Sequence, residues 1–191
     1  MPNWTALVLV RIIHPTLNYC RKRRAASSIA SDLCTQCGLC CNGALFDFGP
    51  LTAEEVPQAR DNGLAVLAEA GNFGFAQPCP ALDGAHCRIY SARPDTCRTF
   101  RCKVLRAVEA EDMTIGEAHS IIARTVAAAN EARAQLPPGA SFTQARRWRR
   151  EAGEAPTLNA PPQLMIALGM LDLLLDQYFR KTSERQILPR E

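Results

Sequence analysis

The chain has 191 residues, of which 47% are hydrophobic, and its formal net charge is +3 at pH 7. This length and composition allow one buried core with a helical part attached to it. The charge counts each cysteine as neutral; eight thiolates holding two Zn²⁺ ions or two [4Fe–4S]²⁺ clusters remove eight charges and regain four, which turns +3 into −1. A protein that binds nucleic acid through an overall basic charge is therefore disfavoured.

Residues 1–30 form a basic extension, because they include the run Arg21–Arg24 and no acidic residue precedes Asp32. We favour an upstream segment with little order; a short amphipathic surface helix and an organelle transit peptide are the alternatives. Arg11 interrupts the apolar run of Leu7–Val10 and no basic region precedes it, so we expect no secretory signal. Cys20 lies in this segment, apart from the other cysteines, and we leave it out of the site.

Eight of the nine cysteines lie within residues 34–102, beginning with the run CTQCGLCC at residues 34–41. Two residues between cysteines let both sulfurs point at one ion from a tight turn, and Gly38 supplies the positive φ that such a turn often needs. Adjacent Cys40 and Cys41 point apart, so they serve two sites or one of them is not a ligand. The predicted metal ligands are Cys34, Cys37, Cys40, Cys41, Cys79, Cys87, Cys97 and Cys102.

Eight soft ligands are the number for two four-coordinate centres, either zinc held by four thiolates or an iron–sulfur cluster held by four cysteines. One four-ligand centre with spare thiols is the alternative. Cys34, Cys37 and Cys40 repeat the C-x2-C-x2-C start of bacterial ferredoxins, although the C-x3-C-P that follows there is absent. A zinc ribbon has a second C-x2-C pair, which this chain lacks. The spacing favours iron, as a cluster of the [4Fe–4S] type, over Zn²⁺. His86 could replace a cysteine as ligand, but we expect it to be a loop residue.

Basic side chains follow or flank the later cysteines, and Arg93 and Arg98 are the two that we expect to matter for the cofactor. Guanidinium groups lower the pKa of nearby thiols and offset the negative charge of a thiolate-bound centre. A more specific hypothesis is that one of these arginines binds the carboxylate or phosphate of a substrate. We favour outer-shell support of the metal.

Between the first cysteines and Cys102 we expect few regular elements. A short strand or extended segment is predicted at residues 44–48, and a helix over about 53–70, opened by a capping box of Thr52 and Glu55. Residues 72–82 are expected to form a loop that presents Cys79. The stretch from 79 to 102 has little regular structure beyond a brief strand near 87–90, so we expect its order to come from the metal.

The C-terminal part is predicted to be helical. A second capping box, Thr114 with Glu117, opens a helix that runs to about Gln135. The last helix, about 163–183, is apolar over most of its circumference, which indicates a buried core or interface helix. No segment has the ~20 uninterrupted apolar residues of a membrane span.

Residues 146–150 read RRWRR, and basic side chains around an aromatic ring can stack on a nucleic-acid base. Glu151 and Glu154 follow, and on a helix the arginines would spread over several faces. We therefore expect a solvated helix with Trp148 packed inward. Taken together, the chain predicts an α+β, mostly helical fold: a basic extension (1–30), a small loop-rich cysteine-ligated metal core (31–103) and a helical region packed on it (104–191).

The cysteine run, with the later segments CxIY at 87–90 and RPxxCRxFxC at 93–102, resembles the CxxCxxCC cysteine-cluster family, the YkgJ-like proteins, often described as putative zinc- or iron-chelating. The resemblance covers about Leu33 to Cys102 and implies that these cysteines bind metal. Nine cysteines in a small protein could form disulfides if it were secreted, but metal thiolates in a reducing cytoplasm are favoured.

The leading hypothesis is a metal-binding protein, and two alternatives remain. One relative of the family is a flagellin lysine N-methylase, so the resemblance also implies a methyltransferase or redox enzyme that uses S-adenosylmethionine (SAM) and a cluster. However, the chain has neither the radical-SAM C-x3-C-x2-C triplet nor a glycine-rich phosphate loop. The other alternative is a zinc-stabilised adaptor whose last helix docks a protein. The expected partner or substrate is a protein in each case, not a nucleic acid.

Overall fold

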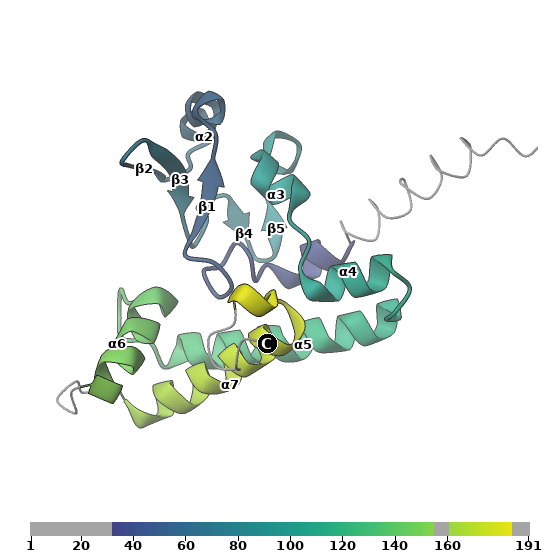
Figure 1. Cartoon of the computed structure of the whole chain (residues 1–191), viewed down its shortest axis with the longest axis vertical. Coiled ribbons are helices and arrows are strands. Elements are labelled where there is room, and N and C mark those ends of the chain that lie inside the picture. The colour runs from purple at the N-terminus through teal and green to yellow at the C-terminus, as the bar shows by residue number, and fades with distance from the viewer. Residues whose placement is uncertain (1–31, 155–160, 185–191) are drawn as a thin grey trace, which may run out of the picture.

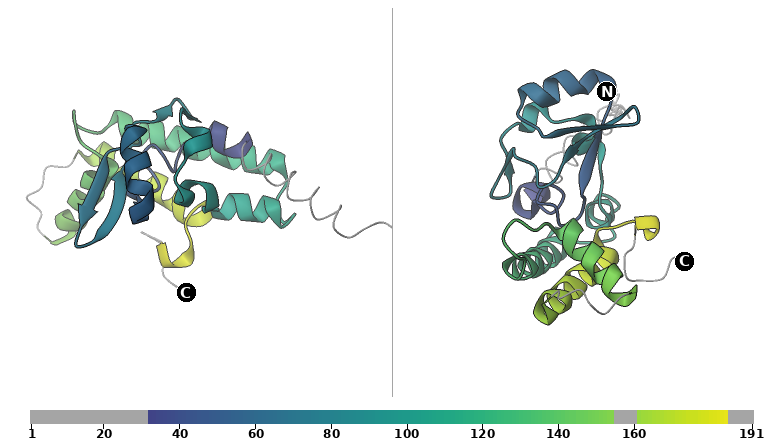
Figure 2. Two further views of the ribbon diagram at one scale, coloured as in Figure 1. Left: turned by 90° about the horizontal axis from the view of Figure 1, so that it is seen from above. Right: turned by 90° about the vertical axis from the view of Figure 1, so that its left-hand side faces the viewer.

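The computed structural model describes residues 32–154 and 161–184. A small antiparallel sheet with two short helices lies above three longer helices, and the cysteine-bearing segments pass between these two parts (Figure 1). The same separation is visible from the side in the right-hand view of Figure 2. The predicted α+β, mostly helical fold is confirmed. The basic extension and Cys20 lie outside the described residues.

The main sheet has three antiparallel strands in the order β1-β3-β2. They are β1 (Phe48–Leu51), β2 (Val66–Glu69) and β3 (Asn72–Ala76). A second pair, β4 (Leu82–Asp83) and β5 (His86–Cys87), sets Leu82 opposite Cys87.

The strand expected at residues 44–48 begins only at Phe48. Residues 42–45 bend instead, and Ala44 and Leu45 are 0% and 6% exposed within the helical part of the molecule. The Leu45 amide donates to the Leu39 carbonyl, which closes a loop where a strand would need a neighbouring strand.

The prediction of a helix over residues 53–70 is wrong for the second half of this range. The capping box is present, with the Thr52 amide donating to Glu55 Oε2 at 3.0 Å, and it opens a 3₁₀ turn (Ala53–Glu55) and α2 (Val56–Asp61). Gly63, at φ +75°, follows the helix end. The chain then forms β2, and a two-residue turn of Ala70 (φ 48°) and Gly71 (φ 83°) leads directly into β3, so the loop expected at 72–82 is partly a strand. Two successive positive φ values are what a tight hairpin turn requires, and strand pairing here outweighs helix propensity.

The helices after Cys87 are more numerous than predicted. A 3₁₀ turn (Tyr90–Ala92) precedes α3 (Asp95–Thr99), and α4 (Lys103–Glu109) begins directly after Cys102. The predicted capping box of Thr114 and Glu117 opens α5 (Ile115–Ala134), with the Thr114 amide 2.8 Å from Glu117 Oε2. The fold continues with α6 (Phe142–Glu154), α7 (Pro162–Tyr178) and a 3₁₀ turn at Thr182–Glu184.

Two separate clusters of buried apolar residues lie in the two parts of the molecule. The larger cluster joins α4, α5, α6 and α7 to the segment that carries the first cysteines, through Leu33, Leu39, Ala44 and Leu45. The smaller cluster lies between the sheet, α2 and the loop before β4, and consists of Leu51, Ala59, Leu64, Phe75 and Ala81. The cysteine run thus belongs to the helical core, although α5 to α7 follow it by more than seventy residues.

A buried ionic network connects α6 with α7, which corrects the expectation of a solvated α6. Arg146 is 5% exposed and Asp172 0%. The Asp172 carboxylate accepts hydrogen bonds from Arg146 and Arg180 at 2.8 and 3.1 Å and forms an ion pair with Arg149 at 2.9 Å. Arg180 also pairs with Asp176 at 2.7 Å. α6 lies against the face of α7 that carries these carboxylates, so two of its arginines point inward.

The rest of α6 agrees with the prediction of a solvated helix whose Trp148 packs inward. Trp148 is half-buried against the larger core and Arg147 is exposed. Among the helices that the structure describes, none combines the length and the apolar character needed to cross a bilayer.

Candidate metal centre

The first cysteines lie where a helical segment ends in a tight turn. Residues 32–37 are helical, and Gly38 at φ +65° reverses the chain so that the amides of Cys41 and Asn42 both donate to its carbonyl, at 2.9 and 3.0 Å. A β-carbon at Gly38 would lie 3.4 Å from the Cα of Ala85, so this turn also packs against the β4–β5 hairpin. The positive φ expected at Gly38 is confirmed.

Two arginines from distant helices hold the loop that follows the run. Arg133 of α5 donates to the Asn42 carbonyl at 2.9 Å, and Arg146 donates to the Ala44 carbonyl at 2.6 Å. Because Arg146 also belongs to the buried network around Asp172, this network fixes the backbone three residues after Cys41. Neither arginine was among the predicted site residues.

Seven of the eight clustered cysteines line one cavity of about 320 Å³, and the eighth, Cys102, lies outside its lining. The remaining wall is largely apolar and aromatic, with Phe46, Phe75 and Phe100 among its members. Segments as distant as 34–41, 79–87 and 93–97 therefore meet around one space, and the thiols gather as the sequence predicted.

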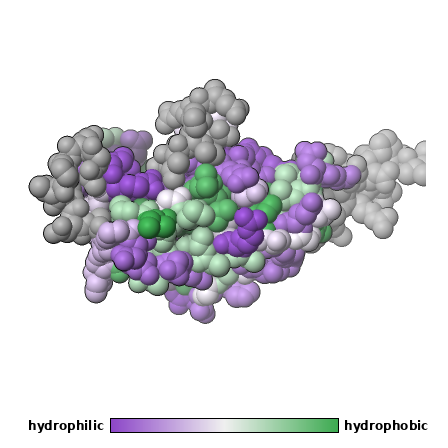
Figure 3. Space-filling model, turned by 90° about the horizontal axis from the view of Figure 1, so that it is seen from below, coloured by the Kyte–Doolittle hydropathy of each residue, from purple (hydrophilic) through white to green (hydrophobic). Residues whose placement is uncertain are grey.

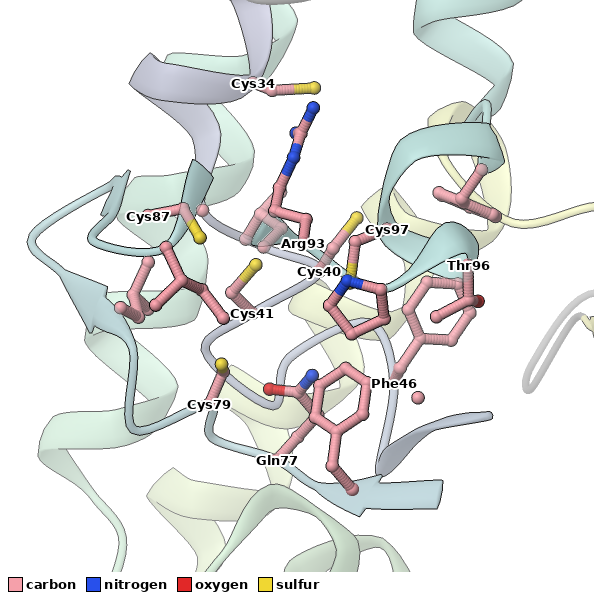
Figure 4. Close-up of a pocket in the computed structure, with 18 of the residues that line it drawn as sticks. Cys34, Cys40, Cys41, Phe46, Gln77, Cys79, Cys87, Arg93, Thr96 and Cys97 are labelled. Atoms are coloured by element: carbon pink, nitrogen blue, oxygen red, sulfur yellow. The ribbon is translucent and has the colours of Figure 1, made fainter. Parts of the chain in front are cut away.

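The later cysteines reach this region from loops and short helices. The amide of Cys79 donates to the Cys41 carbonyl at 2.7 Å, and the amide of Leu82 donates to the Cys79 carbonyl at 3.0 Å. In Figure 4 the sulfurs of Cys41, Cys79 and Cys87 point into the same space, which Cys97 borders from α3, while Cys34 lies at the far end beside the Arg93 guanidinium.

Cys102 is the N-cap residue of α4. Its sulfur accepts from the amide of Leu105 at 3.4 Å, so the helix end is satisfied by a thiol. Cys37, Cys40 and Cys102 all pack against the larger hydrophobic core. The side chain of Cys102 thus lies on the helical side of the cavity.

Burial dominates the electrostatics of the thiols. Desolvation raises the pKa of Cys37 and that of Cys41 to about 12, and that of Cys97 to about 11, with neighbouring thiols adding to each rise. Desolvation also raises the pKa of Cys34, although this residue is exposed, and the charges of Arg93 and Arg101 oppose the rise. Without a bound cation these thiols are protonated at neutral pH, so any metal that binds them must displace protons.

Of the two arginines proposed for the cofactor, Arg93 lies among the thiols and Arg98 does not line the cavity. The Arg93 guanidinium carbon lies 3.6 Å from the centroid of the Tyr90 ring, and its charge lowers the pKa of Cys34 and of Cys97 against the stronger effect of desolvation. The Arg98 side chain is 52% exposed and 3.7 Å from Asp95.

Arg101 supplies a second positive charge near Cys34. It donates to the carbonyls of Arg98 and Phe100 at 2.8 and 3.0 Å and pairs with Glu109 of α4 at 3.1 Å. These bonds lock the turn between α3 and α4, which carries Cys97 on one side and Cys102 on the other. The sequence signal for this role was only its place in the RPxxCRxFxC segment.

His86 was expected in a loop but lies in the short strand β5, next to Cys87, where it is exposed and absent from the cavity lining. His119 of α5, which we did not include in the site, has its Nε2 3.3 Å from the carboxylate of Asp32.

The donor set fits a soft metal or an iron–sulfur cluster. The eight described cysteines are free thiols. Among the described residues no three His, Cys, Asp or Glu side chains are already arranged around one ion position, so the thiols surround a space and do not converge on a point. Four-cysteine ligation remains the chemistry that such a set offers.

Comparison with known proteins agrees with this donor set. Residues 33–127 match the model of the CxxCxxCC family, described as a putative zinc- or iron-chelating domain. The match confirms the resemblance seen in the sequence, and it extends through α4 and into α5. No curated protein and no solved structure matches the chain.

Proposed function

We propose that this protein binds iron, as an iron–sulfur cluster, through cysteines of the CxxCxxCC domain, and that Zn²⁺ is the alternative metal. The observation that carries the proposal is the cavity of about 320 Å³ lined by seven thiols from three distant segments. The proposed ligands are the eight clustered cysteines, which are Cys34, Cys37, Cys40, Cys41, Cys79, Cys87, Cys97 and Cys102.

The size of the cavity supports iron over zinc. Four thiolates close around a single zinc ion at about 2.3 Å and leave no free volume between them. A cluster of several iron and sulfide ions needs space among its ligands. The C-x2-C-x2-C spacing of Cys34, Cys37 and Cys40 favours the same choice.

The surroundings of the thiols suit a thiolate-bound centre. The largely apolar wall of the cavity limits the contact of water with a bound centre, and solvent exposure is one of the properties that set the potential of a cluster. Arg93 is proposed to offset the negative charge of the loaded centre, and Arg98 to help from the exposed side of α3. A reducing compartment such as the cytoplasm is part of the proposal, since thiolates must stay reduced to bind metal.

The test is the absorption spectrum and the metal content of the full chain purified without oxygen. We expect brown protein that absorbs broadly near ~400 nm, with iron and acid-labile sulfide in similar amounts. Colourless protein that contains zinc would show that the bound metal is Zn²⁺ and not iron. Protein that holds neither metal, and gains neither on reconstitution with iron and sulfide or with Zn²⁺, would contradict the proposal.

One observation favours the adaptor as a second candidate. α7 exposes Ile166 (69%), Met170 (55%) and Leu173 (37%), which recur at helical spacing along one face. Figure 3 views the molecule from the side on which α7 lies and shows apolar surface between polar groups. If the protein is an adaptor, Met170→Glu should abolish the binding of its partner protein and leave the metal content unchanged. The methylase alternative would instead need SAM bound by the metal-loaded protein.

A further inference from the structure

The eight thiols do not form one set, because the five that pack against a hydrophobic core divide between two different cores. Cys37, Cys40 and Cys102 pack against the larger core of the helices. Cys79 and Cys97 pack against the smaller core beside the sheet. A ligand moves with the core against which its side chain packs, so a metal centre that mixed the two sets would have to connect two independently packed parts.

The backbone assigns two more cysteines. Cys41 belongs with Cys79, because the amide of Cys79 donates to its carbonyl at 2.7 Å. Cys87 belongs there too, since it pairs with Leu82 in the β4–β5 hairpin and the amide of Leu82 donates to the Cys79 carbonyl at 3.0 Å.

Cys34 belongs with Cys37, because both lie on the helical segment of residues 32–37, where side chains three positions apart share one face.

We propose that the cysteines form two separate four-cysteine metal centres, joined by the Cys40–Cys41 peptide bond. The helix-side group is Cys34, Cys37, Cys40 and Cys102, and the sheet-side group is Cys41, Cys79, Cys87 and Cys97. This division rests on the proposed function, because it assigns the ligands of the metal that the domain is proposed to hold. Each group has the four soft ligands that a zinc ion or a [4Fe–4S] cluster takes.

The two groups differ in how they are supported. The helix-side ligands lie on the helical segment 32–37, on the turn that follows it and at the start of α4, and three of them pack against the larger core. The sheet-side ligands lie on the β4–β5 hairpin, on turns and loops, and on the short α3. Arg93 lies at the cavity between them, near both Cys34 and Cys97. We therefore expect the sheet-side centre to lose its metal first.

Four double variants built from the same four cysteines test the division. Cys40→Ser with Cys102→Ser removes two ligands of one group, and Cys41→Ser with Cys79→Ser removes two of the other. We expect each to lose half of the bound metal and half of the absorbance. The crossed pairs, Cys40→Ser with Cys79→Ser and Cys41→Ser with Cys102→Ser, damage both groups and are expected to lose all of it.

Equal metal loss in the same-group and crossed variants would overturn the division. A wild-type chain that holds no metal after reconstitution would instead contradict the proposed function, so the two failures are distinguishable.

A second measurement avoids any variant that fails to fold. Wild-type holoprotein is treated with a chelator in steps, each sample is alkylated, and the labelled positions are mapped by mass spectrometry. Cys41, Cys79, Cys87 and Cys97 should become reactive together, before the other four. The division is wrong if Cys40 and Cys41 become reactive at the same chelator step while the four cysteines within each group become reactive at different steps.

Discussion

The helical half and the sheet half of this protein are stabilised in different ways. The helical half buries eighteen apolar residues in one cluster, which is enough to hold four helices and the first cysteine loop without further help. The sheet half buries five, around Phe75, for a segment that includes both sheets, α2 and α3. So small a core rarely stabilises a fold alone, and small domains of this kind usually depend on metals or disulfides. We therefore expect a bound metal to contribute most to stability in the sheet half, where the apolar core is smallest.

Removal of the metal should therefore have the largest effect, and a different one in each half. We expect residues 79–102 to lose their protection against hydrogen exchange after chelation, because metal ligation supplies folding free energy that their few apolar contacts cannot. α5 and α7 should keep most of theirs. The measurement is hydrogen exchange by mass spectrometry with and without chelator. Unchanged protection at 79–102 would show that this segment does not need a metal.

Disruption of the ionic network should destabilise the helical half. Arg146→Met leaves the Asp172 carboxylate, 0% exposed, short of one partner, and removal of one member of a buried ion pair costs about 3–5 kcal/mol. The loss of the bond to the Ala44 carbonyl should also loosen the cysteine loop. Denaturant unfolding of the loaded protein measures both, through its midpoint and its metal release. Arg147→Met, on the exposed face of the same helix, is the matched control and should change stability by no more than about 0.5 kcal/mol.

Two glycine substitutions should act in opposite directions in the two halves. A β-carbon at Gly49 of β1 would lie 2.4 Å from the ring of Phe75, so Gly49→Ala should cost about 1–3 kcal/mol by overpacking the small core. Gly169 of α7 has no atom within 4 Å of an added β-carbon, so Gly169→Ala should stabilise by about 0.5–1 kcal/mol. Thermal unfolding of the two loaded variants measures both effects. A stabilised Gly49→Ala variant would mean that β1 does not pack on Phe75 in this way.

The smallest effect is expected from Glu55, which links the turn before α2 to α3 within the sheet half. Its carboxylate accepts from the amide of Thr52 at 3.0 Å and from that of Asp95 at 2.7 Å, and these bonds lower its pKa below 4.5. A carboxyl whose pKa is lower in the folded state contributes stability above its unfolded pKa and loses it as pH falls through the folded pKa. Glu55→Gln should therefore lower the unfolding midpoint at pH 7 and have less effect well below pH 4.5.

The measurement for Glu55 is the difference in midpoint from wild type across this pH range. Glu69→Gln, at an exposed position on β2, serves as the control. A pH-independent difference would mean that the two amide bonds do not favour the carboxylate over the acid.

The sequence predicted best what is encoded locally. Both capping boxes are present, because each depends on two residues three positions apart. The helix expected to continue to residue 70 was wrong because Val66–Glu69 find their partners in β3, and the apolar residues of so short a stretch suit either element. α3 and α4 were missed because they are five and seven residues long and gain their order from the arginine bonds and thiol cap around them.

For the site, the sequence identified the cysteines but could not assign them to groups. The spacing indicated that Cys40 and Cys41 point apart, yet which distant thiol each one faces depends on how the helices and the sheet pack. The ionic network was also missed, although Asp172 and Asp176, two acidic residues in an otherwise apolar helix, were a usable signal. Charged residues in such a helix are buried only with partners, and arginines on α6 supply them.

Native mass spectrometry of the full chain, purified without oxygen and kept intact in the gas phase, tests the central claim most directly. The account predicts a mass above that of the polypeptide by two metal centres, lost in two steps as chelator is added, the first accompanied by reactivity of Cys79 and Cys87. A reconstituted chain whose mass equals that of the polypeptide alone, with all eight thiols reactive from the start, would contradict it.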